Sequence, residues 1–181
     1  PYQIATISDL RWISENQDVW YNDNFFIQVA NIDANSTSGW NSSQGFSPIG
    51  NEWYPFNGNY DGQNHTISNL YINRQLGDDN GIGLFGNIEY VTISNLGLTD
   101  IDITGDVKTG GLAGKSMFSD FNNCYTTGYL DSSYQNYNFC GGGLVGFDQH
   151  SDFTDCYSTV GINEGNFDAG GEAAGGLIAY V

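Results

Sequence analysis

The segment GGLVG at residues 142–146 has near-copies at regular intervals along the chain. These are IGLFG at 82–86, GGLAG at 110–114 and GGLIA at 175–179. The glycines that open the core of each copy are 28, 32 and 33 residues apart: Gly83, Gly111, Gly143 and Gly176. A period in this range is typical of repeat architectures, in which each repeat forms one supersecondary unit.

A second phrase repeats in step with the first: ISNLYI (67–72), ISNLGL (93–98), FNNCYT (121–126) and FTDCYS (153–158). The apolar residues of each repeat follow short alternations typical of β-strands rather than a helical stripe. Ile93, Leu96 and Leu98, followed by Ile101 and Ile103, fit two short strands with a corner between them. Stacked repeats would place equivalent apolar side chains in continuous inward rows. We therefore predict an all-β fold, a right-handed parallel β-helix of short-stranded coils. A β-sandwich is the alternative, but it does not predict two phrases in step.

Glycine, Asn, Asp and Ser separate the predicted strands, and the chain has 25 glycines and three prolines. We expect the glycines to form tight corners that need positive φ. The last copy has Ala179 where the others end in glycine, which leaves the geometry of that corner open. The predicted structural glycines are Gly83, Gly86, Gly111, Gly114, Gly143, Gly146 and Gly176.

The first quarter of the chain lacks the phrase. TISDLRWISEN (6–16) has apolar residues at helical spacing, with Thr6 or Ser8 as the N-cap. Because a stack of coils exposes its end, we expect this short helix to cap the first coil. We assign residues 1–62 to the cap helix, first strands and a long loop, and residues 63–181 to the repeats, within one continuous domain.

The chain is strongly acidic. Four Lys and Arg oppose 21 Asp and Glu in 181 residues, a formal net charge of −17. Such a field repels nucleic acid and anionic membrane surfaces, so we predict neither partner. Hydrophobic residues make up 39% and aromatic residues 15% of the chain, which favours a packed core over disorder. No apolar run is long enough to insert into a membrane, and we expect the solenoid to continue in a longer parent protein.

The three cysteines, Cys124, Cys140 and Cys156, are sixteen residues apart and match no zinc-binding pattern. Cys124 and Cys156 occupy the same position of successive repeats, so in a stack they would lie roughly 4.8 Å apart. Two interpretations remain open. The thiols form a buried ladder of small hydrophobic side chains, or they form an inter-coil disulfide.

The stretch PFNGNYDGQNHTISNLYI (55–72), followed by IGLFG, GGLAG and GGLVG, resembles the GLUG-repeat proteins of bacterial cell surfaces, which also occur beside IgA-specific metallopeptidase domains. YQIATISDLRWIS (2–14) and FFIQVANIDA (25–34) resemble the segment that commonly precedes such repeats. The resemblance covers nearly the whole chain. It implies a β-solenoid module of a large secreted or surface protein, such as an adhesin, a stalk or a substrate-engaging region.

We predict no catalytic activity. The two histidines, His65 and His150, lie far apart in the sequence and form no HExxH motif, and nucleophile-elbow and phosphate-loop motifs are missing from the sequence. Polysaccharide lyases and glycosidases do use parallel β-helices, and Asp100 and Asp102 should point outward from one strand as a carboxylate pair. The alternative is that these two carboxylates belong to a solvated acidic face and have no catalytic role.

Calcium is the metal that the sequence best supports. GDDNG (77–81) and TDIDITGD (99–106) place several oxygen ligands close together, and calcium takes six to eight of them. Neither segment has the EF-hand spacing, and turns in which Asp and Asn bond their own backbone are the alternative. The candidate ligands are Asp78, Asp79, Asp100 and Asp102. We predict no other cofactor.

Aromatic residues in the long early loop and in the third repeat are the candidate binding residues. Aromatic rings on loops can stack on sugar faces or anchor protein partners. The candidates are Trp40, Trp53, Tyr54, Tyr129, Tyr134 and Tyr137.

These features predict a structural and adhesive module of a secreted or cell-surface bacterial protein. Its partners would be adjoining solenoid repeats, other copies of itself stacked into filaments, a surface glycan or a host protein. The alternative is a glycan-binding or polysaccharide-degrading β-helix module. An ice-binding solenoid is disfavoured because outward threonines do not recur in the repeats.

Overall fold

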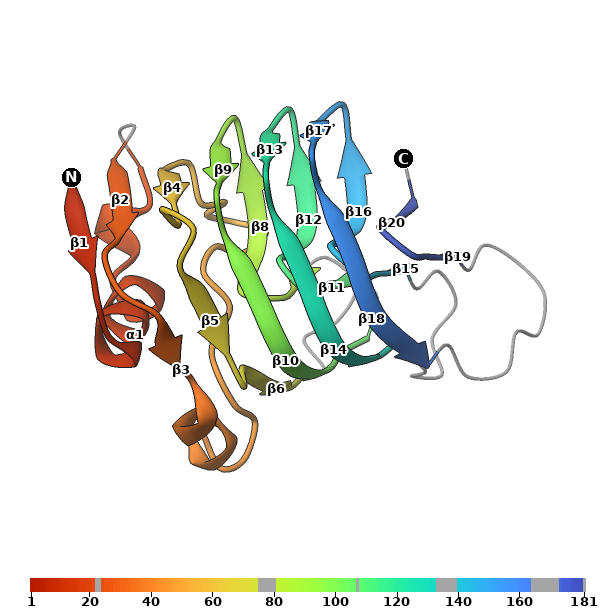
Figure 1. Cartoon of the computed structure of the whole chain (residues 1–181), viewed down its shortest axis with the longest axis horizontal. Helices are drawn as coiled ribbons and strands as arrows, with labels where there is room; N and C mark the ends of the chain where they lie inside the picture. The colour runs from red at the N-terminus through yellow and green to blue at the C-terminus, as the bar shows by residue number, and fades with distance from the viewer. Residues whose placement is uncertain (22–23, 75–80, 107, 133–139, 164–172, 181) are drawn as a thin grey trace.

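The chain folds into a stack of parallel β-coils, with a short α-helix at its N-terminal end (Figure 1). The computed structural model describes residues 1–21, 24–74, 81–106, 108–132, 140–163 and 173–180. The predicted all-β solenoid with an N-terminal helix is confirmed. None of the helices in these ranges is long and apolar enough to cross a membrane.

Four parallel sheets run along the stack. Sheet A orders β1 (Tyr2–Ile4), β2 (Phe25–Gln28), β4 (Asn59–Asp61), β9 (Thr92–Ser94), β13 (Asp120–Asn122) and β17 (Asp152–Thr154). Sheet B orders β3 (Ile32–Asp33), β5 (Thr66–Ser68), β10 (Gly97–Thr104), β14 (Tyr125–Asp131) and β18 (Tyr157–Asn163), and β6 (Tyr71–Asn73) also pairs with β10. Sheet C orders β8 (Phe85–Glu89), β12 (Ala113–Met117), β16 (Val145–Gln149) and β20 (Ile178–Tyr180). Sheet D orders β7 (Gly81–Ile82), β11 (Lys108–Gly110), β15 (Cys140–Gly142) and β19 (Ala173–Gly175).

From β4 onward, each coil passes through the four sheets in the order A, B, D, C, as β9 to β12 do. The next two coils are β13 to β16 and β17 to β20, stacked in Figure 1 from green to blue. The predicted corner between Leu98 and Ile101 is wrong, because a single strand, β10, runs through both residues; the corner lies earlier, between β9 and β10. Beyond it β10 is continuous, with a bulge between Leu98 and Ile101.

The core consists of inward rows that receive one side chain from each coil. The phrase leucines Leu84, Leu112 and Leu144 are completely buried. In another row, Phe121 stacks on Phe153 with ring centroids 4.8 Å apart. Each side chain is covered by its counterparts in the coils above and below, and full burial of one such side chain contributes about 1.5–3 kcal/mol. This packing explains why apolar residues recur at the period of the coil.

The glycines of the repeated phrase lie at the corner between sheets D and C, where successive coils approach closely. A Cβ on Gly83 would lie 2.6 Å from the carbonyl oxygen of Gly110, and one on Gly143 would overlap the carbonyl oxygen of Gly176. None of the predicted structural glycines has a positive φ. The prediction that these corners need positive φ is therefore wrong. Glycine fits there because the neighbouring backbone leaves no room for a side chain.

Left-handed backbone occurs instead at the corners on either side of sheet A. At the corner between sheets A and B, Asn64, Asn95, Asn123 and Asp155 have φ between 53° and 63°. Asn and Asp adopt this conformation more readily than other residues that carry a Cβ. Their side chains also bond along the stack, since Asn123 Nδ2 donates to Asn95 Oδ1 (3.1 Å) and Asn95 Nδ2 donates to Asp61 Oδ1 (3.0 Å). We call this row the amide ladder.

The helix α1 (Ile7–Glu15) closes the N-terminal end of the stack. Its N-cap is Thr6, whose Oγ1 accepts from Asp9 N (3.2 Å), while Asp9 Oδ2 accepts from Thr6 N (2.8 Å), which completes a capping box. Leu10 and Ile13 are completely buried in the core, as expected for a cap. Two 3₁₀ segments follow, η1 (Gln17–Val19) and η2 (Asn35–Gly39). Sheet A runs from β1 to β17 across residue 62, so the cap region and the repeats share one sheet.

Candidate binding surface

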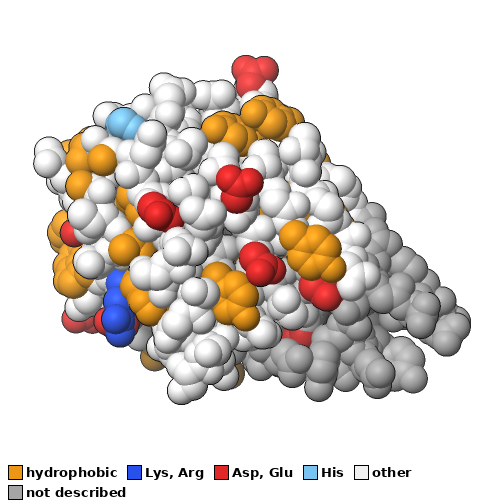
Figure 2. Space-filling model, turned by 60° about the horizontal axis from the view of Figure 1, so that its bottom comes forward, with side chains coloured by type: hydrophobic (Ala, Val, Ile, Leu, Met, Phe, Trp, Pro, Cys, Tyr) orange, Lys and Arg blue, Asp and Glu red, His pale blue; other side chains and the backbone are white. Residues whose placement is uncertain are grey.

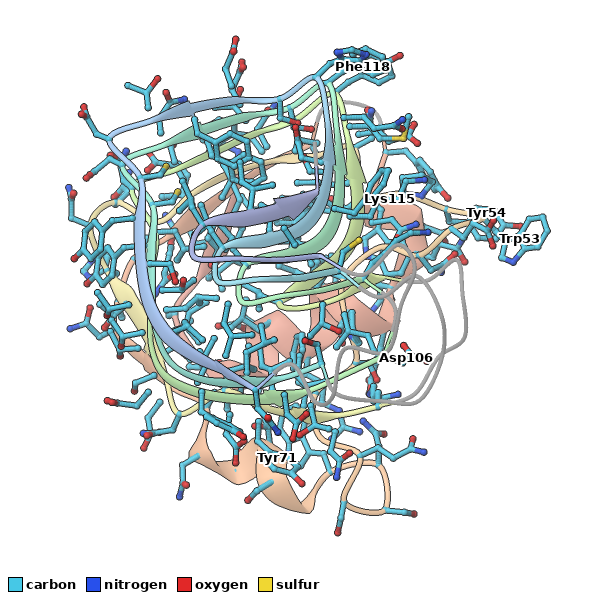
Figure 3. All side chains as sticks on the ribbon, turned by 90° about the vertical axis from the view of Figure 1, so that its right-hand side faces the viewer. Trp53, Tyr54, Tyr71, Asp106, Lys115 and Phe118 are labelled. Atoms are coloured by element: carbon cyan, nitrogen blue, oxygen red, sulfur yellow. The ribbon has the colours of Figure 1, made fainter. Side chains whose placement is uncertain are left out.

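Three aromatic side chains stack at the corner between sheets C and A. Tyr90 follows β8, Phe118 follows β12 and His150 follows β16, one in each successive coil. The ring centroids are 5.2 Å apart for Tyr90 and Phe118 and 5.3 Å apart for Phe118 and His150. All three are exposed, Tyr90 at 64% and Phe118 at 44%. We call this row the ring ladder, and Figure 3 shows Phe118 projecting from its corner of the coil.

The ring ladder has left-handed backbone. The φ angles of Tyr90, Phe118 and His150 are 56°, 48° and 62°. This conformation costs an L-residue roughly 1–2 kcal/mol, and bulky side chains adopt it less readily than Asn. Hydrogen bonds between coils hold it in place, since Tyr90 N donates to Met117 O (3.1 Å) and Phe118 N donates to Gln149 O (2.9 Å). Unfavourable backbone that carries exposed side chains points to a role in binding.

Carboxylates flank the ring ladder. Glu89 precedes Tyr90, and Asp120 and Asp152 begin the strands that follow the ladder, β13 and β17. Asp120 and Asp152 are exposed and paired in register, so two like charges lie on adjacent strands. Their field disfavours an anionic ligand, so this corner suits a neutral or cationic one.

Trp53 and Tyr54 lie in the loop before β4, with exposed fractions of 78% and 49%. Asn51 Oδ1 accepts hydrogen bonds from both of their backbone N–H groups (3.0 and 3.1 Å) and fixes the turn. The same loop pairs with β8 of sheet C through bridges at Ile49 and Phe56. Figure 3 shows both side chains projecting outward from the coil. The loop and the ring ladder therefore both adjoin sheet C.

The other predicted aromatic residues lie elsewhere. Trp40 is half-buried, and the guanidinium of Arg11 lies over its ring, 4.9 Å from the centroid, so this side chain contacts the helical cap. Tyr129 belongs to sheet B and is 45% exposed. Tyr134 and Tyr137 lie outside the described residues. The structure thus brings Trp53 and Tyr54 together and separates them from Trp40.

The predicted carboxylates are only partly described. Asp100 and Asp102 are both exposed on β10, and Asp100 occupies the bulge with φ of 52°, where its N–H donates to Thr127 Oγ1 (3.2 Å). Asp78 and Asp79 lie outside the described residues. Within the part of the chain that the structure describes, no three or more His, Cys, Asp or Glu side chains form a group that could hold a metal ion. Calcium binding stays a prediction.

The three cysteines are free thiols. Cys124 is buried, and Cys156 lies half-buried in the next coil. A hydrogen bond from Cys124 lowers the pKa of Cys156 to about 7. The same hydrogen bond, together with burial, raises the pKa of Cys124. Burial also raises the pKa of Cys140, which lies in sheet D.

The sequence analysis missed the ring ladder, although the sequence contains a signal for it. Tyr90, Phe118 and His150 each follow the opening glycine of a phrase by seven residues: 90 − 83, 118 − 111 and 150 − 143. The three residue types differ, so a search for a repeated letter does not find them. A constant offset within a solenoid nevertheless places side chains in one row along the stack.

The face drawn in Figure 2 carries acidic side chains scattered among uncharged polar ones, and basic side chains appear at one edge. Hydrophobic side chains on this face lie in small separate groups. Isolated apolar side chains of this kind are ordinary on a protein surface. This face therefore adds no apolar patch to the candidate binding surface.

Part of the chain is similar in sequence to a known protein. The chain is 35% identical over 123 residues to halomucin from Haloquadratum walsbyi, a match that covers 64% of this chain and 1% of halomucin. No family model matches the chain. The resemblance to GLUG repeats therefore stays a prediction. Because the chain spans so small a share of halomucin, the activity and partners of the whole protein are matters for proposal.

Among solved structures, the chain is similar to a crystal structure described as a candidate immunoglobulin A1 protease from Bacteroides ovatus. The TM-score is 0.38 and the sequence identity 16%, with 98% of this chain and 83% of that chain covered. A similarity this low carries no argument about function.

Proposed function

We propose that this chain is a non-catalytic structural module of an extracellular or cell-surface protein, and that its last coil pairs with a further parallel coil of the same kind. The β-solenoid fold and the similarity to halomucin support this proposal. The fold supplies a rigid column whose inward rows are filled, and its acidic surface keeps the column soluble in water.

The proposal rests on the coil formed by β17 to β20, which, in the part of the chain that the structure describes, has unpaired strand edges and partly exposed inward side chains. Among the described residues, β17, β18 and β20 each pair on one side only. Phe153 and Leu177 are partly exposed, whereas their counterparts one coil earlier, Phe121 and Leu144, are completely buried. An edge with unpaired backbone groups and partly exposed inward side chains is a template for another strand. A second copy of this chain or an adjoining repeat has the required geometry.

The test is sedimentation velocity of the isolated chain over increasing protein concentration. Edge pairing predicts association that grows with concentration. Val160→Lys should abolish association, because Val160 is an inward, half-buried residue of β18. The matched control is Thr159→Lys, since Thr159 is the exposed neighbour on the opposite face of the same strand. A wild-type chain that stays monomeric throughout, or two lysine variants that behave alike, would contradict edge pairing.

A glycan-binding surface is the second candidate, and the ring ladder is the observation that favours it. Because the rings stack on one another, their exposed edges form a continuous apolar row with polar groups nearby, against which a sugar can lie. Because carboxylates flank the ladder, this proposal predicts neutral or amino polysaccharides as ligands rather than sulfated or uronic ones. The proposal extends to Trp53 and Tyr54, which adjoin the same sheet.

The test is retention of the protein on a panel of neutral, cationic and anionic polysaccharides. Phe118→Asn should weaken retention, because Asn suits the left-handed backbone and removes the central ring. Tyr129→Asn, on sheet B, is the matched control and should leave retention unchanged. Equal retention by both variants would exclude the ring ladder as the site. Release of reducing ends from any polymer would overturn the non-catalytic part of the first proposal.

A further inference from the structure

Cys124 and Cys156 occupy equivalent positions in successive coils. The strands on both sides of them pair with the same offset of 32 residues, Asn122 with Thr154 and Tyr125 with Tyr157. Adjacent parallel strands lie roughly 4.8 Å apart, and Cα atoms joined by a disulfide are usually 4.4–6.8 Å apart. The coil spacing therefore falls within the Cα range that a disulfide bridges.

The two thiols point the same way. Cys124 Sγ lies 3.5 Å from Ile93 O, and Cys156 Sγ lies 3.4 Å from Phe121 O, the equivalent carbonyl one coil later. The aromatic pair Tyr125 and Tyr157 stacks beside them with centroids 5.0 Å apart, which fixes the register locally. The two thiols also hydrogen-bond to each other, so their sulfur atoms are neighbours.

The two cysteines differ in their access to solvent. Cys124 is completely buried, whereas Cys156, in the last described coil, is only half-buried. The hydrogen bond from Cys124 lowers the pKa of Cys156, so Cys156 supplies the thiolate at neutral pH. A reactive, accessible thiolate beside a second thiol is the arrangement of a nucleophilic and a resolving cysteine.

We propose that Cys124 and Cys156 are a disulfide-forming pair that closes when a small-molecule disulfide such as oxidised glutathione is present. The Cys156 thiolate attacks one sulfur of glutathione disulfide, which forms a mixed disulfide and releases one glutathione thiolate. Cys124 then attacks the Cys156 sulfur and releases the second glutathione, and the thiol protons of the protein pass to the two glutathione molecules. The product links the coil of β13 and β14 to the coil of β17 and β18. The inference rests on the equivalent positions of the two thiols and on the access of Cys156 to solvent in the isolated chain.

Cys140 provides the internal control. It lies in β15 of sheet D, where its register partners are Lys108 and Ala173. No second cysteine adjoins it, and it is buried. The proposal therefore predicts that Cys140 stays a thiol when the other two residues react.

The experiment treats the folded chain, with Cys140 in place, with oxidised glutathione and follows intact mass, disulfide-linked peptides and the free thiol of Cys140. The expected result is loss of two hydrogen atoms from the protein and a peptide that joins Cys124 to Cys156. The initial rate should rise with pH through about 7, as the Cys156 thiolate forms. In Cys124→Ser the mixed disulfide on Cys156 should persist, and in Cys156→Ser no adduct should form, because Cys124 is buried.

Three results would overturn the proposal. The first is a lasting glutathione adduct on Cys156 in the presence of Cys124, and the second is a disulfide between two chains. The third is no change in mass under conditions in which the unfolded chain reacts fully. Circular dichroism of each variant before oxidation establishes that the comparison is made between folded proteins.

Discussion

Replacement of Gly111 by alanine tests whether the glycines of the repeated phrase are needed for space. A Cβ at Gly111 would lie 2.7 Å from the carbonyl oxygen of Gly143 and 2.9 Å from methyl carbons of Ile101 and Thr126. The backbone oxygen cannot rotate away, so the coils must separate by about 0.7 Å to restore an ordinary contact of about 3.4 Å. That movement also stretches the hydrogen bond from Leu112 N to Leu144 O, which is 2.9 Å long.

The magnitude follows from three contributions. Overpacking costs about 1–3 kcal/mol, and a weakened hydrogen bond between the coils costs about 1 kcal/mol. Alanine returns about 0.4–1 kcal/mol because it restricts the unfolded chain. We therefore expect Gly111→Ala to lower the free energy of unfolding by about 1–3.5 kcal/mol.

The assay is urea unfolding followed by circular dichroism, and Gly176→Ala is the matched control. Gly176 occupies the same position of the last phrase, but among the described residues nothing lies within 4 Å of a Cβ placed there. We expect this variant to stay within about 0.5 kcal/mol of the wild type. Because neither glycine has a positive φ, equal destabilisation of the two variants would refute the space argument.

Three further predictions concern the amide ladder, the helix cap and the surface charge. Asn95→Ala should lower the free energy of unfolding by about 1–2 kcal/mol, because alanine disfavours the left-handed backbone. Asn95→Gly should recover part of that loss in the same urea assay. If the glycine variant is no more stable than the alanine variant, the loss comes from the side-chain hydrogen bonds instead. Thr6→Ala should cost about 0.5–2 kcal/mol through loss of the capping box. Slight burial raises the pKa of Asp9, but hydrogen bonds from Ala5 and Thr6 outweigh it, so the pKa in the folded protein is lowered. The ionised Asp9 therefore stabilises the fold above the unfolded pKa of about 3.9, and this contribution is lost as pH falls through the lower folded pKa. Urea titrations between pH 2 and 7 should therefore show a smaller loss of stability at acid pH for the Thr6 variant, and parallel curves would exclude this contribution. Finally, the urea midpoint should rise with sodium chloride concentration, because salt screens the repulsion among the acidic side chains of a chain with net charge −17. The Debye length falls from about 10 Å at 0.1 M salt to about 3 Å at 1 M. A midpoint that falls or stays constant would show that charge repulsion does not limit stability.

The solenoid and its N-terminal helix were predictable because both depend on periodic burial. The leucines Leu84, Leu112 and Leu144 recur at the period of a coil since each must cover the next. The helix was predictable from the spacing of its apolar residues and from Thr6 as a capping residue. The recurring leucines and the helical spacing both reflect contacts between residues that are neighbours along the chain or in adjacent coils.

The reason for the glycines was not predictable. A glycine in a sequence indicates either positive φ or close backbone approach, and only the stack distinguishes the two. At Gly83 the carbonyl oxygen of Gly110 decides the matter, and that contact depends on how tightly the coils pack at the corner between sheets D and C. The left-handed positions that the sequence analysis assigned to glycine belong to Asn95 and its counterparts.

The ring ladder was missed for a related physical reason. Tyr90 and Phe118 have low propensity for the left-handed backbone that they adopt, so no local rule indicates a corner there. Hydrogen bonds to the coil above impose the conformation, and these bonds exist only once the register is set. Trp53 and Tyr54 could be identified because they lie in a loop, where exposure is the ordinary expectation.

The flat stacking of the coils has a consequence for the shape of any protein built from them. One coil of 28 residues, from Gly83 to Gly111, advances the column by roughly 4.8 Å. That is roughly 0.2 Å for each residue, against 1.5 Å in an α-helix. A β-solenoid therefore gains little length for each residue added, and it provides instead a wide cross-section and resistance to bending. For the same number of residues an α-helix is several times longer, so what each added coil supplies is lateral surface rather than length.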